Sequence, residues 1–63
     1  MVNIDKVNDM LDSSITRLSE VHYILNKLSL DYAKEGYAET YNKYNTLADS
    51  ISLTICTLAQ SKK

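Results

Sequence analysis

The sequence predicts an all-α protein, a two-helix antiparallel hairpin that dimerises into a four-helix bundle. Three observations lead to this prediction. Apolar residues recur at alternating three- and four-residue intervals through the first half of the chain. A second series with the same spacing follows, shifted by two residues. The chain has only 63 residues, so it forms one domain (1–63) with a marginal core that oligomerisation would stabilise.

The first helix is expected near residues 3–29. Its apolar series is interrupted only at Ser14, and such a series is typical of a helix that packs along one stripe. Asn3 or Asp5 can cap the helix, because short polar side chains accept hydrogen bonds from the free amides of the first turn. The series consists of Ile4, Val7, Leu11, Leu18, Val21, Leu25 and Leu28.

A turn near residues 30–35 is expected to reverse the chain, with the second helix near 33–60. In one straight helix, a shift of two residues would rotate the second series by about 200° from the first, so the two could not pack together. Asp31 is the expected cap of the second helix. Alternatively, Gly36 lies just after the first helix as its C-cap. The second series consists of Tyr37, Tyr41, Tyr44, Ala48, Ile51, Ile55 and Leu58.

Residues 51–58 carry a competing strand signal. They begin as an apolar–polar alternation and are rich in β-branched side chains. A lone strand would need an edge to pair with, and no other segment has a strand pattern, so we expect a helix here. Lys62 and Lys63 either complement the negative end of this helix dipole or form a frayed tail.

Composition argues against several classes of function. Seven Lys and Arg stand against eight Asp and Glu, so the chain has no general attraction for nucleic acid or for membranes. One cysteine and one histidine provide neither an intrachain disulfide nor a zinc site. The carboxylates lie outside both apolar series and no glycine-rich loop is present, so we expect no enzyme, cofactor, metal site or small-molecule substrate. The lone thiol favours the cytoplasm.

The single histidine and cysteine have simple structural interpretations. His22 flanks the first apolar series, so we expect a partly buried, hydrogen-bonded side chain. Cys56 is expected to be a small, semi-buried residue.

The aromatic residues are five tyrosines, without phenylalanine or tryptophan. Tyr37, Tyr41 and Tyr44 share one helical face near the turn, either as an aromatic platform for a partner or as a wedge in the core. Tyr23 falls opposite the first apolar series and should be exposed. The predicted partner contacts are Tyr23, Tyr32 and Tyr37.

These features predict a small non-enzymatic protein–protein interaction module, such as a bacterial or phage-encoded regulator or adaptor. Its expected partners are a second copy of the chain and another protein. The oligomer core would consist of the first series, together with the second series from Tyr41 to Leu58. An alternative is a structural subunit of an assembly, which would grow beyond a dimer.

In length and plan the chain resembles the Rop-type plasmid proteins, short helical hairpins that dimerise into four-helix bundles and bind paired RNA loops. The resemblance implies an alternative RNA contact through Lys6, Arg17 and Lys27 of the first helix. The Rop-type basic face includes a phenylalanine, which this chain lacks, and here the basic residues are interleaved with acidic ones. RNA binding would show a steep dependence on salt concentration.

Overall fold

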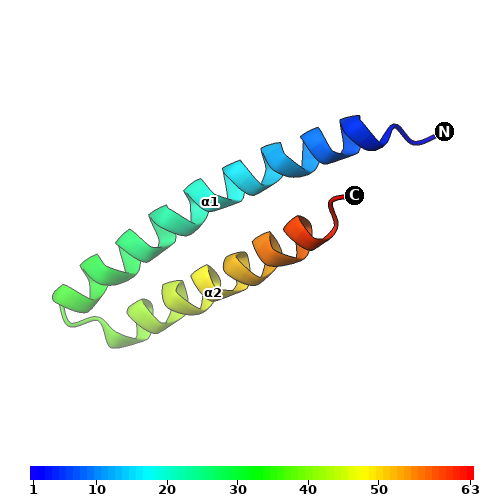
Figure 1. Ribbon diagram of the computed structural model, residues 1–63. Helices are drawn as coiled ribbons and strands as arrows, with labels where there is room; N and C mark the ends of the chain where they lie inside the picture. Colours follow the sequence, from blue (N-terminus) through cyan, green and yellow to red (C-terminus); the bar gives the residue numbers. More distant parts are fainter.

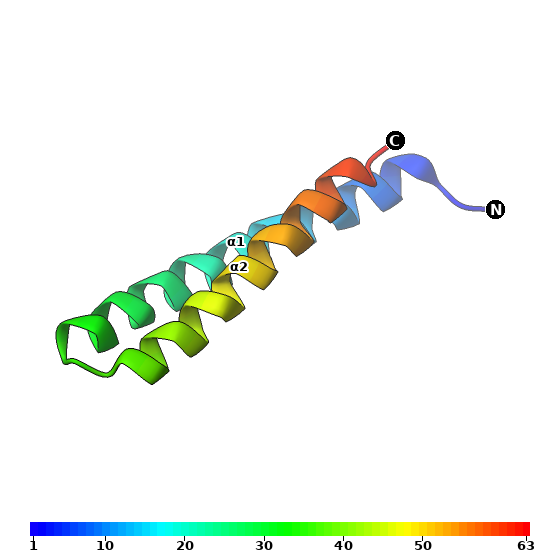
Figure 2. The same cartoon turned by 90° about the horizontal axis from the view of Figure 1, so that it is seen from below.

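The chain folds into two antiparallel helices of unequal length (Figure 1). The computed structural model describes residues 1–63. Helix α1 spans Ile4–Lys34 and helix α2 spans Ala38–Gln60, and there is no strand. Both termini lie at the same end of a rod measuring 52 × 14 × 13 Å (Figures 1 and 2). The predicted helical hairpin is therefore confirmed.

Asn3 caps the start of α1. Its side-chain oxygen accepts a hydrogen bond from the backbone amide of Lys6 at 3.1 Å. This bond satisfies one of the amides that have no partner within the first turn. Asp5, the other candidate, lies inside the first turn, where its negative charge complements the helix dipole.

The predicted turn at residues 30–35 is wrong, because α1 continues to Lys34. Asp31 therefore lies inside α1 and does not cap α2; its carbonyl accepts a hydrogen bond from the amide of Glu35 at 3.2 Å. The alternative position of Gly36, just after the end of α1, is the one observed. Gly36 has a φ of +83°, the left-handed conformation that side chains with a Cβ disfavour.

The turn is a Schellman motif. The amide of Gly36 donates to the carbonyl of Ala33 at 3.1 Å, and the amide of Tyr37 donates to the carbonyl of Tyr32 at 3.0 Å. The rings of Tyr32 and Tyr37 meet edge to face with their centroids 6.1 Å apart. An apolar contact between these two positions commonly accompanies the motif. The sequence signal was present, since Gly36 is preceded four residues earlier by one tyrosine and followed directly by another.

Helix α2 starts from the same motif. The carbonyl of Tyr37 accepts a hydrogen bond from the amide of Tyr41 at 2.9 Å, so Tyr37 belongs both to the cap of α1 and to the start of α2. Residues 51–58 are helical, as expected. The hydroxyls of Thr54 and Thr57 donate to the carbonyls four residues earlier, each at 3.0 Å, which satisfies these side chains within the helix.

The seam between the helices retains four of the seven predicted α1 residues. Leu11, Leu18 and Leu25 face α2 as predicted. In the other predicted row, Val7 is half-buried as predicted, but Val21 and Leu28 lie at the flank and are exposed. Another row packs against α2 in place of Val21 and Leu28, and its residues lie four positions after Leu11, Leu18 and Leu25. That row consists of Ile15, His22 and Ser29. The row of Val21 and the row of Ile15 both fit helical spacing with the row of Leu18. The position of α2 therefore decides which of the two packs at the seam.

The partner residues on α2 match the second apolar series. Tyr41, Tyr44, Ile51, Ile55 and Leu58 are all half-buried, and Ala48 is buried. Ile4, at the start of α1, belongs to the predicted oligomer core and is exposed in the single hairpin.

Candidate functional site

The hairpin has almost no interior. Only Ala48 and Ser29 are buried, at 1% and 3% exposure, and both have small side chains that allow the helices to approach closely. The Ser29 hydroxyl donates to the carbonyl of Asn26 at 2.8 Å, and no buried side-chain nitrogen or oxygen lacks a partner. The surface has no pocket, and no three metal-ligating side chains come together. The candidate functional residues are therefore those on the helix surfaces.

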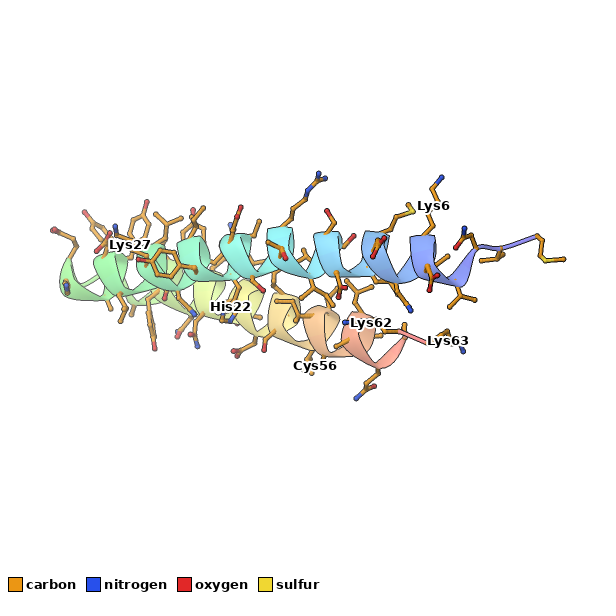
Figure 3. The ribbon with its side chains drawn as sticks, turned by 45° about the horizontal axis from the view of Figure 1, so that its top comes forward. Lys6, His22, Lys27, Cys56, Lys62 and Lys63 are labelled. Carbon is orange, nitrogen blue, oxygen red and sulfur yellow. The ribbon has the colours of Figure 1, made fainter.

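A polar clasp joins the two termini. The Asn8 side-chain amide donates to the carbonyl of Lys63 and accepts from the amide of Lys63, each at 3.0 Å. The Lys62 ammonium lies 2.6 Å from an Asp12 carboxylate oxygen. In Figure 3 both lysines lie at the end of α2, beside the first part of α1. The C-terminal lysines are therefore docked on α1, whereas the sequence left them as either a dipole partner or a frayed tail.

The clasp identifies one broad side of the hairpin, which we call the clasp side. Counting about 100° per residue from Leu18 at the seam, Asn8 and Asp12 lie about 80° and 120° in one direction. Asn26, Leu30 and Tyr23 lie in the same direction, and Asn45 lies on this side of α2. The strip of the clasp side next to the seam thus carries the amide groups of Asn8, Asn26 and Asn45, whereas Leu30 and Tyr23 lie further from the seam.

The opposite broad side is apolar, and we call it the open side. By the same count, its α1 residues lie about 60° to 120° from the seam in the other direction. They fall at the three- and four-residue spacing of a second stripe, interrupted by Ser14 and Arg17. The exposed apolar residues of the open side are Met10, Val21, Ile24 and Leu28 on α1 and Leu47 on α2.

The three tyrosines predicted as partner contacts have different surroundings. Tyr23 is 68% exposed and Tyr37 is 59% exposed, so both rings are accessible. Tyr32 is half-buried, and its ring stacks on that of Tyr44 with centroids 5.6 Å apart. Tyr32 therefore contributes to packing at the turn. Tyr41 is also half-buried, so Tyr41 and Tyr44 match the core-wedge interpretation while Tyr37 lies at its exposed margin.

The basic residues considered for RNA contact are all exposed on α1. Lys6 and Lys27 lie near opposite ends of the helix (Figure 3), about 30 Å apart at 1.5 Å per residue. Arg17, between them, lies within the stripe of the open side. The structure brings no further basic cluster to these residues, and RNA binding stays a prediction.

The single histidine and cysteine lie apart from each other on the hairpin (Figure 3). His22 is half-buried at the seam, and its Nδ1 lies 3.4 Å from the Asn26 side-chain nitrogen, which confirms the partly buried, hydrogen-bonded histidine. Cys56 is a free thiol on the exposed surface of α2, so the expected semi-buried environment is wrong. It lies outside the seam because the neighbouring residue Ile55 occupies the inward position.

Comparison with known proteins adds no candidate residue. No protein-family model, curated protein or solved structure matches the chain. Neither helix is long and apolar enough to cross a membrane. The candidate surfaces of the hairpin are the open side, the clasp side and the two exposed tyrosines.

Proposed function

We propose that the protein is a small non-enzymatic interaction module, a regulator or adaptor in the cytoplasm. It works as a pair of hairpins packed into a four-helix bundle, and it contacts another protein through its outer helix faces and its turn. The exposed free thiol of Cys56 supports a reducing compartment.

The observation that carries this proposal is the imbalance between buried and exposed apolar residues. The hairpin buries one apolar residue, Ala48, whereas twelve large hydrophobic residues are exposed. A single layer of two helices cannot enclose a core, and domains normally consist of two layers packed around a hydrophobic core. A chain below about 70 residues with this little burial needs oligomerisation or another staple to be stable. Pairing of two hairpins supplies the second layer.

Contact with another protein is assigned to the exposed tyrosines, Tyr23 and Tyr37. Tyrosine is enriched at protein interfaces because it offers a large apolar ring with a polar hydroxyl. Tyr37 is held by its edge-to-face contact with Tyr32, so less side-chain entropy is lost when a partner covers it. Tyr23 lies on α1, away from the turn, and provides a second contact point.

The pairing is tested by light scattering of the full chain over a wide range of concentrations, with circular dichroism at each point. We expect the mass of two chains and high helix content, with helix content falling as dilution separates the pair. A fully helical species with the mass of one chain at all concentrations would contradict the pairing. Growth beyond two chains would instead support an assembly subunit.

The contact assignment is tested by capture from cell extract with a Tyr23→Ala, Tyr37→Ala double variant. We expect a protein that binds the wild type to be lost from the double variant and retained by Leu53→Ala. Leu53 is 71% exposed at the outer edge of α2, so this control removes an exposed apolar side chain elsewhere. Equal capture by all three would overturn the assignment, and retention of RNA that disappears with added salt would support the RNA-binding alternative.

A further inference from the structure

The two broad sides of the hairpin differ in chemistry although both consist of the same two helices. On the clasp side, half-buried asparagines and the terminal clasp occupy the strip next to the seam. On the open side, that strip carries Val21, Leu28 and Leu47, each only partly exposed because the neighbouring helix covers one edge. Met10 continues it toward the start of α1, and Ile24 extends it outward. A stripe at heptad spacing beside the seam of the hairpin is the pattern of a helix that packs against two neighbours.

We propose that a second copy of the chain docks on the open side, so that Met10, Val21, Ile24, Leu28 and Leu47 of both copies form one shared interface. This inference rests on the pairing proposed above and assigns that pairing to one surface. It leaves the clasp side, with Tyr23, on the outside of the bundle.

The accessible area of the chain supports pairing, and the apolar stripe assigns that pairing to the open side. The hairpin exposes 5039 Å². A folded monomer of 7.1 kDa is expected to expose about 4,100 Å². The excess of roughly 900 Å² is close to the area of about 800 Å² that each partner buries in a stable interface of standard size. Burial of an interface of that size would thus bring the chain to the exposure of an ordinary folded protein.

The large uncovered area of the hairpin favours a second copy of the chain as the partner on the open side. A partner required for folding itself must be present in equal amount at all times, and another copy of the chain always is. Twofold pairing through one surface is also the commonest arrangement in protein oligomers. The two polar residues within the stripe are compatible with such pairing. Ser14 is small, and the long side chain of Arg17 can lie along the interface with its charged group in water.

The test compares Ile24→Glu with Leu30→Glu in the full-length chain. The two residues lie on the same helix and are 55% and 59% exposed in the hairpin, but Ile24 is on the open side and Leu30 on the clasp side. Helix propensity changes by a similar, small amount at both positions, so the surface is the main difference. We expect Ile24→Glu to weaken pairing by about 100-fold or more, because an unpaired charge would be buried. Leu30→Glu should pair within about threefold of the wild type, as is usual for surface substitutions.

The outcomes separate this inference from the proposed pairing. If the wild type is a helical monomer, both are wrong. If the wild type and both variants pair equally, pairing stands and the open side is not the interface. If Leu30→Glu separates the copies and Ile24→Glu does not, the interface is on the clasp side.

A second measurement avoids adding a charge and works even if Ile24→Glu fails to fold. In a Cys56→Ser background, Ile24→Cys and Leu30→Cys each place one thiol on one side of the hairpin. We expect maleimide to label the Ile24→Cys variant about tenfold more slowly than the Leu30→Cys variant in concentrated solution, with the rates converging on dilution as copies separate. Equal rates in a solution shown to contain paired chains would overturn the assignment.

Discussion

The two ends of the hairpin are closed in different ways. At the turn, Gly36 and the tyrosines form contacts between residues close in sequence, with hydrogen bonds that span three to five residues. At the termini, the Asn8–Lys63 bonds join residues 55 positions apart, and both bonds are exposed to solvent. A contact between distant residues must first offset the entropy of closing the chain, and exposed polar contacts contribute little net stability. We therefore expect the turn to be the stable end and the termini to open first.

The largest expected effect is from Tyr44→Ala, which removes the ring stacked on Tyr32. We expect a loss of about 2–3 kcal/mol in the free energy of unfolding, somewhat below the range for a fully buried aromatic ring because Tyr44 is half-buried. Urea unfolding measures this loss, and it is done at one fixed chain concentration because the stability of a paired chain depends on concentration. Tyr23→Ala, at an exposed ring, should cost less than about 0.5 kcal/mol. Equal losses would show that the stack does not stabilise the turn.

Gly36→Ala should cost about 1 kcal/mol. The φ of +83° disfavours any L residue with a Cβ, and no atom lies within 4 Å of the added carbon, so the cost comes from the backbone alone. The control is Glu35→Ala, one residue earlier, where φ is −84° and alanine fits without strain. Both are compared by urea unfolding. A neutral Gly36→Ala would mean that the turn adopts another conformation in solution.

Asn8→Ala should cost about 0.5–1 kcal/mol, because two exposed hydrogen bonds to Lys63 are lost. Its effect should be local. Amide hydrogen exchange in the last turn of α2 should accelerate, while exchange next to the turn at Gly36 stays unchanged. Asn42→Ala, an exposed asparagine on α2, is the control and should change neither. Faster exchange throughout α2 would show that the clasp holds the whole hairpin.

The smallest effect is expected from Asp12→Asn, which removes the negative partner of Lys62. Both side chains are substantially exposed, so the loss should be about 0–0.5 kcal/mol in low salt. It should disappear in about 1 M salt, where exposed charges are screened. Thermal unfolding of the wild type and the variant at both salt concentrations checks this. A difference that persists in high salt would contradict an exposed ion pair.

The sequence predicted the two helices and their reversal because two apolar series with a mismatched register cannot share one straight helix. It misplaced the turn by a few residues. Asp31 is a good capping residue, but one capping residue does not show where the hydrogen bonds of a helix stop. The cooperative motif of Gly36 with Tyr32 and Tyr37 decided the boundary, and it requires three positions to be considered together.

The candidate surfaces were less predictable than the helices. Tyr23 was correctly expected to be exposed, because it falls far from both rows of the first series. Val21 and Leu28 were expected to pack in a core, but within one hairpin they lie on the open side. Helical spacing alone allows the row of Val21 or the row of Ile15 to accompany Leu18. The choice depends on where the second helix sits.

By itself, the sequence determined that this protein consists of two helices and that their apolar surface exceeds what one hairpin can bury. These properties follow from local spacing and from the number of apolar residues. The tertiary structure alone decided which rows of α1 face α2 and that the C-terminal lysines dock on Asn8 and Asp12. Those features depend on the rotation and register of one helix against the other. In this arrangement the small residues Ser29 and Ala48 are the two that become buried. The same arrangement places an apolar stripe on the open side and the half-buried asparagines on the clasp side.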